Sequence, residues 1–179
     1  ESNRLGKPEF LAKQFKTNLN LKNSGKWEYL INGDRIWRIK IEAKDAKAIM
    51  PIFDDFFLPK GANLYLYGND YKQILGSYTE NNNHQSKMFS TEVLYGNALI
   101  IEYYEPKEQF NQGSFTLNTV CSFFKGIYIN GNGDFDINES DPCQINVNCS
   151  PVGDNWQDEK KGVARIYIPY GNTVYSCTG

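Results

Sequence analysis

The feature that most constrains the fold is a series of short alternating segments separated by glycine and asparagine turns. Residues 35–42, Arg-Ile-Trp-Arg-Ile-Lys-Ile-Glu, alternate apolar and polar side chains and follow the turn signal Asn32-Gly33-Asp34. Successive side chains of a strand point to opposite faces, so this pattern predicts a strand entered from a tight turn. The same criteria predict strands at residues 27–31, 63–67, 73–79, 91–95, 98–104 and 115–124. An all-β domain, a β-sandwich or jelly roll, is therefore expected over residues 1–125.

Two of these segments, residues 91–95 and 98–104, flank Gly96-Asn97, and we expect them to form a hairpin. Residues 43–57 are ambiguous, because their apolar side chains recur near helical spacing. Pro51 lies in the middle of this stretch, and an interior proline costs a helix about 3 kcal/mol. We therefore expect a short helical turn there, or an extended segment that packs its phenylalanines.

The four cysteines are candidates for disulfides. They lack the paired C-x2-C spacing of a zinc site, and the chain has one histidine. Three of them lie in the C-terminal quarter, which favours a local disulfide framework in an oxidising compartment over buried thiols of a cytosolic protein. The candidates are Cys121, Cys143, Cys149 and Cys177.

Residues 126–142 differ from the rest in composition. They are rich in glycine, asparagine and acidic residues and contain too little apolar surface to order easily, so we predict a linker between two units, 1–125 and 143–179. Oxygen-bearing side chains alternate along it as in a calcium loop, but Glu139 replaces the expected glycine and no bidentate glutamate follows at the right spacing. We predict no metal site. The alternating residues are Asn130, Asn132, Asp134, Asp136 and Asn138.

The C-terminal quarter carries a more specific pattern. Cys143 and Cys149 form a C-x5-C segment, an apolar strand follows at residues 162–168, and Cys177-Thr-Gly179 comes next. This order resembles the opening of the catalytic domain of secreted bacterial trypsin-like serine proteases of the lysyl-endopeptidase kind. The resemblance implies that residues 143–179 are the opening strands of a trypsin-like β-barrel.

The N-terminal unit carries a second pattern, whose most specific phrases are Leu58-Pro-Lys-Gly-Ala62 and Glu102-Tyr-Tyr-Glu-Pro106. In their order these phrases resemble the pro-region found ahead of such proteases in Bacteroidetes-type bacteria. The resemblance implies a precursor in which this unit keeps the zymogen inactive or assists folding of the barrel.

The resemblance also implies which parts of a protease are missing from these residues. The family's catalytic histidine lies beyond Cys-Thr-Gly, so we expect no catalytic residue here, no cofactor and no activity from this chain alone. The single histidine, His84, lies in a polar Asn-rich stretch and is expected to be a solvated loop residue, since a triad needs an orienting partner and a held serine.

Maturation and disulfide pairing are further expectations from the family. Cys143, Cys149 and Cys177 would pair with downstream cysteines, and Cys121 has no assigned partner. Cleavage is expected near Glu139, Ser140 and Asp141, where no lysine or arginine lies, so either another protease trims the chain or the enzyme's specificity is not for lysine. The expected partner is the remainder of the protease domain, and the expected location is secreted or periplasmic.

An alternative function is a secreted carbohydrate-binding β-sandwich. Tyr65 and Tyr67 fall on one face of a predicted strand and Leu64 and Leu66 on the other, so one face is aromatic. The net charge is -2 with basic residues spread along the chain, which does not indicate a nucleic-acid partner. No apolar run is long enough to predict a membrane span.

Overall fold

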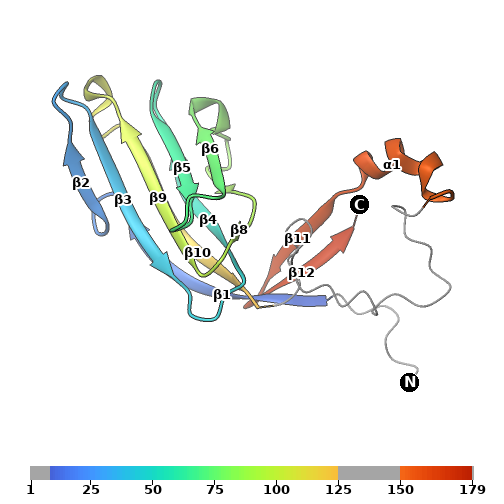
Figure 1. Cartoon of the computed structure of the whole chain (residues 1–179). Helices are drawn as coiled ribbons and strands as arrows, with labels where there is room; N and C mark the ends of the chain where they lie inside the picture. The colour runs from blue at the N-terminus through green and yellow to red at the C-terminus, as the bar shows by residue number, and fades with distance from the viewer. Residues whose placement is uncertain (1–8, 125–149, 179) are drawn as a thin grey trace.

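The structure is a computed structural model that describes residues 9–124 and 150–178. These residues are mostly β and form two curled antiparallel sheets, which confirms the predicted all-β class (Figure 1). The helical elements are short and lie in the connections. They are η1 (Glu80–Asn82), η2 (Lys107–Gln109), η3 (Gly153–Trp156) and α1 (Gln157–Gly162).

The five-stranded sheet has the order β2-β3-β9-β5-β6. Strand β2 pairs with β3 through the predicted turn, where the Leu30 N–H donates to the Asp34 carbonyl at 2.8 Å. The segment around Gly68 likewise joins two paired strands, as expected. The strands are β2 (Lys26–Tyr29), β3 (Arg35–Glu42), β5 (Asn63–Tyr67), β6 (Ile74–Tyr78) and β9 (Ala98–Glu105).

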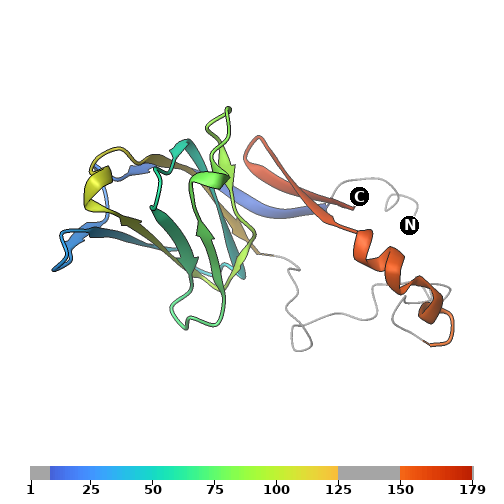
Figure 2. The same ribbon diagram turned by 90° about the horizontal axis from the view of Figure 1, so that it is seen from above.

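The seven-stranded sheet has the order β11-β12-β1-β10-β4-β7, and β8 also pairs with β4. Its long central strands cross under the five-stranded sheet, and β1 continues past that sheet to meet the β11–β12 hairpin (Figure 2). The strands are β1 (Glu9–Asn20), β4 (Ala48–Phe57), β7 (Phe89–Ser90), β8 (Leu94–Tyr95), β10 (Ser114–Phe123), β11 (Arg165–Tyr170) and β12 (Thr173–Thr178).

The core between the two sheets is rich in aromatic side chains. Phe115 lies at its centre, with its ring centroid 5.5 Å from Trp37 and 5.5 Å from Tyr103, both edge to face. Phe56 stacks on Phe89 with centroids 4.3 Å apart. Each large apolar side chain buried in this way contributes roughly 1.5–3 kcal/mol to stability, so this cluster is the main tie between the sheets.

A second apolar cluster lies on the opposite, outer face of the seven-stranded sheet. Its members come from β1, β4, β10 and β12, together with Val93 just before β8. The ring of Tyr167 on β11 packs edge to face against Phe123, with centroids 5.3 Å apart. The hairpin is therefore attached by burial as well as by backbone pairing. The buried members are Leu11, Ala12, Ala48, Met50, Val93, Cys121, Phe123 and Val174.

A buried ion pair fixes the loop that follows β9. The Arg35 Nε donates to the Glu105 Oε2 at 2.7 Å, and the guanidinium lies between the rings of Trp27 and Phe110, 3.9 and 4.4 Å from their centroids. Glu105 also accepts the Tyr103 hydroxyl at 3.1 Å. Both oxygens of the buried Glu105 carboxylate therefore accept hydrogen bonds, which offsets the cost of removing the charge from water.

The structure differs from the sequence expectations in the strand pairing around residues 91–104 and in an additional N-terminal strand. The expected hairpin of residues 91–95 with 98–104 is wrong, because β8 pairs with β4 while β9 pairs with β3 and β5. Residues 48–57 are an extended strand, the second of the two expected forms, and Pro51 sits within the strand. Strand β1 was not predicted. The tail does contain a strand near the expected one, at Arg165–Tyr170.

Candidate functional site

The β11–β12 hairpin extends the seven-stranded sheet. Strand β12 pairs antiparallel with β1, with Ala12 opposite Val174 and Lys13 opposite Thr173. Gln14 adds two hydrogen bonds to this pairing. Its side-chain Nε2 donates to the Thr173 carbonyl at 2.5 Å, and its backbone N–H donates to the Asn172 carbonyl at 2.9 Å. A strand of the N-terminal unit therefore holds the hairpin directly.

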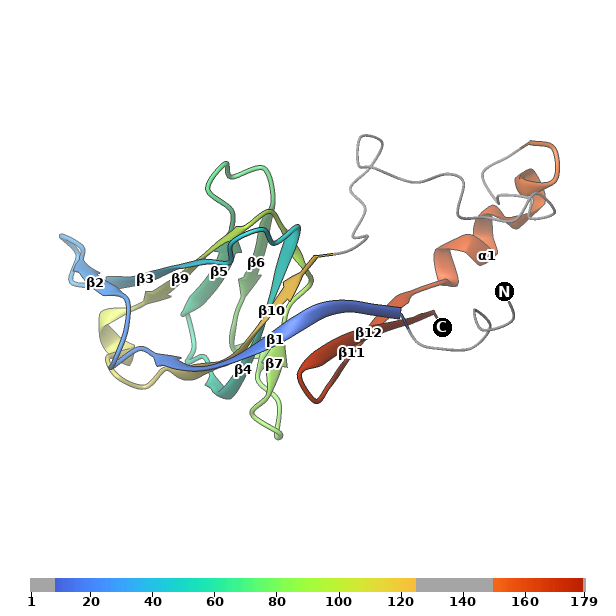
Figure 3. The ribbon, with the colours of Figure 1, turned by 90° about the horizontal axis from the view of Figure 1, so that it is seen from below.

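The two faces of the hairpin differ in burial. Tyr167 and Val174 face the outer apolar cluster. Side chains on the opposite face are exposed, with 46% for Ile166, 47% for Ile168 and 76% for Tyr170. We call the surface formed by these three residues and Phe15 of β1 the uncovered face, because the five-stranded sheet does not extend over it (Figure 3).

Strand β11 is also an edge. Within the described residues it pairs with β12 on one side only and ends the seven-stranded sheet. A free edge offers unpaired N–H and C=O groups to another strand. Pro169 removes one donor from it, and the strand is six residues long. The hairpin thus presents an apolar face and a pairing edge together.

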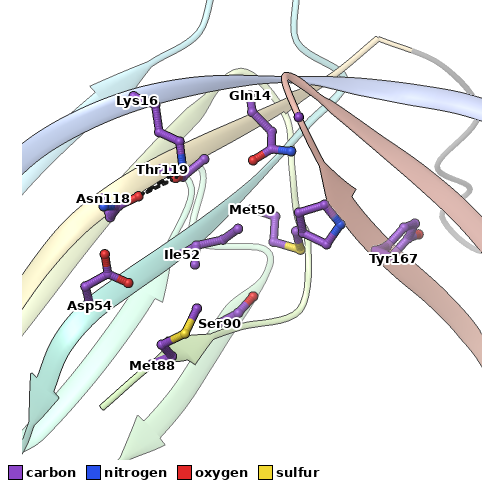
Figure 4. A pocket seen from close by; sticks show the side chains of 12 residues that line it. Gln14, Lys16, Met50, Ile52, Asp54, Met88, Ser90, Asn118, Thr119 and Tyr167 are labelled. Carbon is purple, nitrogen blue, oxygen red and sulfur yellow. Dashed lines mark hydrogen bonds between the residues drawn. The ribbon is translucent and has the colours of Figure 1, made fainter. Parts of the chain in front are cut away.

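A groove of about 750 Å³ lies on the outer side of the same sheet (Figure 4). Its floor comes from β1, β10 and β4, one wall from the segment leading into β7, and the other wall from the hairpin. This volume lies within the range of small-ligand sites, roughly 300–1,000 Å³. The lining residues are Gln14, Lys16, Met50, Ile52, Asp54, Met88, Ser90, Asn118, Thr119, Tyr167, Pro169 and Gly171.

One end of the groove carries a held ammonium group. The Lys16 Nζ donates to the Thr119 hydroxyl at 2.9 Å and to the Asn118 side-chain carbonyl at 3.2 Å. The Thr119 hydroxyl in turn donates to the same Asn118 oxygen at 2.7 Å. Both acceptors are neutral, and Lys16 makes no ion pair with any described residue, so its charge stays available.

Another part of the groove carries a carboxylate. Asp54 of β4 is half-buried and makes no side-chain hydrogen bond or ion pair within the described part of the chain. Between Asp54 and the hairpin wall, where Tyr167 stands, lie the apolar side chains of Met50 and Ile52 (Figure 4). The groove therefore carries an exposed ammonium at Lys16, a half-buried carboxylate at Asp54 and an apolar part toward the hairpin.

The predicted cysteine sites are only partly visible. Cys121 is a free thiol, fully buried in the outer cluster, and this burial raises its pKa to about 12. Apolar side chains of the outer cluster enclose this sulfur, and the disulfide pairing of the four cysteines stays a prediction. Cys143 and Cys149 lie outside the described residues, as do the processing residues Glu139, Ser140 and Asp141 and the candidate calcium loop. The backbone of Cys177 lies in β12.

The single histidine lies where a solvated residue was expected. His84 is exposed in the connection between η1 and β7, and its Nδ1 is 2.9 Å from the Ser86 hydroxyl. No carboxylate among the described residues orients the ring, and these residues contain no cluster of three metal-ligating side chains. Nor does any described helix have the length and apolar character to span a membrane.

The predicted aromatic strand face is largely closed. Leu64 and Leu66 point into the core and Tyr67 to the other side, as expected. Tyr71 stacks on Tyr67 with ring centroids 5.0 Å apart, and the Tyr67 hydroxyl donates to Glu102 at 2.8 Å. Tyr67 is therefore buried, and Tyr71 offers the exposed ring.

Sequence reasoning did not find the groove, because its charged residues, Lys16 and Asp54, lie on two strands distant in sequence that only the strand register brings together. The one signal in the sequence was that Asp54, with Asp55, interrupts an otherwise apolar stretch. No protein-family model matches the chain, and no solved structure matches it. A function for this chain therefore has to be inferred from its residues and their geometry.

Proposed function

We propose that the chain carries the pro-region and the first barrel strands of a secreted trypsin-like serine endopeptidase precursor. The N-terminal unit serves the catalytic domain, either by keeping the zymogen inactive or by assisting its folding. The catalytic histidine, aspartate and serine belong to the remainder of that domain, which is the partner of this chain. The motifs at residues 58–62, 102–106, 143–149 and 177–179 motivate this assignment.

The uncovered face is the observation that supports the proposal best. Ile166, Ile168 and Tyr170 alternate along an edge strand and face away from the outer cluster. Exposed apolar side chains grouped on one face commonly mark a surface that another element covers. A barrel strand pairing with the β11 edge would bury these side chains and satisfy its free backbone groups.

The pairing of β12 with β1 supports a folding role. A barrel built from strands distant in sequence has a high contact order and folds slowly. Here β1 provides a ready template, with Gln14 and Ala12 aligning the hairpin before other strands are added. Release of the mature enzyme then requires that the hairpin leave β1, so the same contact serves to restrain the zymogen.

The proposal extends to compartment and processing. Cys143, Cys149 and Cys177 pair with downstream cysteines in an oxidising secreted or periplasmic environment. Cleavage occurs near Glu139, Ser140 and Asp141, which places both C-x5-C cysteines on the mature enzyme. Because no basic residue lies there, a second protease performs this cut.

The test is to express the complete reading frame and assay it against peptide substrates before and after maturation. Active, processed enzyme with a new N-terminus near Asp141 is the expected result. Ile168→Ser, in the uncovered face, should greatly lower the yield of active enzyme. The control is Ile74→Ser, which alters a similarly exposed isoleucine on the edge of the other sheet. A reading frame that encodes no downstream histidine-containing barrel would contradict the proposal.

The second candidate function is carbohydrate binding, for which Tyr71 is the relevant observation. Its ring is exposed on one side and stacks on Tyr67 on the other, so the exposed face could receive a sugar ring. A glycan array compared between the wild-type chain and Tyr71→Ala tests this candidate. A strong signal that Tyr71→Ala abolishes would favour it over the protease assignment.

A further inference from the structure

The turn between β2 and β3 contains an asparagine followed directly by a glycine, Asn32 and Gly33. Among residues 9–124 and 150–178 no other asparagine precedes a glycine. The backbone nitrogen of the following residue can attack an asparagine side chain, and glycine hinders this attack least because it has no Cβ. Asparagine is for such reasons among the thermolabile residues. Within the described chain, this turn is therefore where the reaction is expected first.

The tip of this turn is open to solvent and depends on its glycine. Asn32 is exposed, and Ile31 beside it is fully exposed. Gly33 has a φ of 92°, a left-handed conformation that a residue with a side chain adopts only at a cost. A Cβ built at Gly33 would also lie 3.2 Å from the Lys107 Cδ. The turn thus keeps the glycine next to an asparagine side chain that water reaches freely.

Hydrogen bonds in the turn act on the two reacting atoms. The Asn32 Oδ1 accepts the Asp34 backbone N–H at 3.1 Å. The ring that this bond closes contains the Asn32 Cγ and the Gly33 nitrogen, so the electrophile and the nucleophile are held near each other. The donated N–H also stabilises the negative charge that develops on Oδ1 during the attack. One bond opposes the reaction, because the Gly33 N–H donates to the Leu30 carbonyl at 3.0 Å and has to be released first.

The Asn32 amide also belongs to a network around the buried carboxylate of Asp34. The Asp34 Oδ2 accepts the Asn32 Nδ2 and the Tyr104 hydroxyl, both at 2.5 Å. The Asp34 Oδ1 accepts the Lys107 backbone N–H at 3.0 Å, which joins the turn to the loop after β9. A carboxylate in place of the Asn32 amide removes one donor and puts a second negative charge beside the first. Chemical change at Asn32 therefore reaches a contact between two loops.

We propose that Asn32 is a site of spontaneous deamidation and that its conversion releases the β2–β3 turn from the loop after β9. The Gly33 nitrogen attacks the Asn32 Cγ, the bond from Cγ to Nδ2 breaks, and the Gly33 N–H proton leaves with Nδ2 as ammonia. Water then opens the cyclic imide at either carbonyl and gives aspartate or isoaspartate. Both products put a new carboxylate into the turn, and isoaspartate also lengthens its backbone by one methylene. This chemistry limits the lifetime of the turn and does not depend on the protease assignment.

The test is mass spectrometry of the whole chain after incubation at mildly alkaline pH. The peptide that contains Asn32 should gain one mass unit, whereas exposed Asn97, which precedes Ala98, should stay unchanged. A synthetic peptide of residues 28–36 is the unfolded reference. It should convert no more than about tenfold faster than the folded chain, because a single turn hydrogen bond has to open in the fold. Conversion of the peptide with none in the folded chain would overturn the proposal.

Variants separate the reaction from its consequence. Asn32→Gln keeps an amide but has to close a larger ring, so its mass should not change. Asn32→Asp carries the charge of the product and should raise amide hydrogen exchange at Lys107 about tenfold, as loss of a hydrogen bond to a charged group does. The matched control is Asn97→Asp, which alters an exposed asparagine of another turn and should leave this exchange unchanged. Exchange at Lys107 that is the same in Asn32→Asp and the wild-type chain would contradict the release of the loop.

Discussion

Phe15 of β1 lies directly opposite Val120 of β10, yet Val120 is 4% exposed and Phe15 is 54% exposed. Opposed residues of an antiparallel pair share one face of the sheet, so the difference comes from what covers that face. The five-stranded sheet covers Val120 and stops before Phe15. The boundary between the core and the uncovered face therefore falls between these two residues.

Of the two faces of the hairpin, only the outer one should contribute side-chain packing to its attachment. Val174→Ala removes two buried methyl groups from the outer cluster, at about 0.8 kcal/mol per buried carbon, and should increase amide hydrogen exchange throughout β11 and β12. Ile166→Ala changes the exposed face of the same hairpin and should alter exchange much less. Equal effects of the two substitutions would show that both faces contribute to attachment.

The ion pair of Arg35 and Glu105 should be sensitive to removal of one partner. Arg35→Met leaves a buried carboxylate without its cation and should lower the free energy of unfolding by about 3–5 kcal/mol. Lys40→Met removes one partner of the exposed pair with Glu42 and should cost less than about 1 kcal/mol. Urea denaturation of both variants measures the difference. A similar small cost for both would contradict the structural role of the pair.

The sequence predicts well those strands whose two faces differ. Residues 35–42 and 63–67 alternate in sequence and match β3 and β5 at both ends, because one face of each packs in the core. Strand β4 instead packs on both faces, with Ile49 in the inner cluster and Met50 in the outer, so alternation disappears. Such a run cannot be distinguished from a helix by its period.

Strand β1 escaped prediction for a related reason. A register shift between Phe10 and Ala12 lets the consecutive residues Leu11 and Ala12 both pack in the outer cluster, so no single alternation runs through the strand. Leu11 packs in the outer cluster and Leu19 against the inner one. The groove followed from the pairing of β1 with β10 and β12, which involves residues distant in sequence. Local alternation therefore predicts individual strands, whereas the groove depends on which distant strands pair and in what register.

Gly113 should not tolerate a side chain. A Cβ at this position would lie 1.9 Å from the Tyr103 hydroxyl oxygen, which donates to the buried Glu105. Gly113→Ala must displace that ring or the backbone and should lower the free energy of unfolding by about 1–3 kcal/mol, as overpacking of a filled core does. Gly162→Ala, at the end of α1 with nothing within 4 Å, is the control and should be neutral or slightly stabilising. Thermal unfolding of both variants decides the point.

The Cys121 thiol should be inert in the folded chain. Burial raises its pKa to about 12, so the reactive thiolate is scarce and the sulfur is inaccessible. Its neutral form is favoured by folding, so this contribution to stability is present below the ordinary value of 9.0 and is lost as the pH rises toward about 12. Alkylation at mildly alkaline pH, followed by peptide mapping, should modify Cys121 only after denaturant is added. Rapid modification of the native chain would place this sulfur at the surface.

Asp34 should contribute to stability at neutral pH and lose that contribution in acid. Its pKa is lowered, chiefly by the hydrogen bond from the Tyr104 hydroxyl at 2.5 Å and then by the Lys107 backbone N–H at 3.0 Å. A lowered pKa means that folding favours the carboxylate, so the stabilisation is complete above the ordinary value of 3.8 and is lost as the pH falls through the folded-state value.

Asp34→Asn should therefore lower stability at neutral pH and flatten the acid limb of the stability–pH curve. The matched control is Asp70→Asn, which alters an exposed carboxylate paired loosely with Lys72 at 3.6 Å. Urea unfolding between neutral pH and the acid transition measures both variants against the wild-type chain. Because Asp34 joins the β2–β3 turn to the loop after β9, its protonation should release that loop before the core unfolds. An acid limb unchanged by Asp34→Asn would assign the acid transition to other carboxylates.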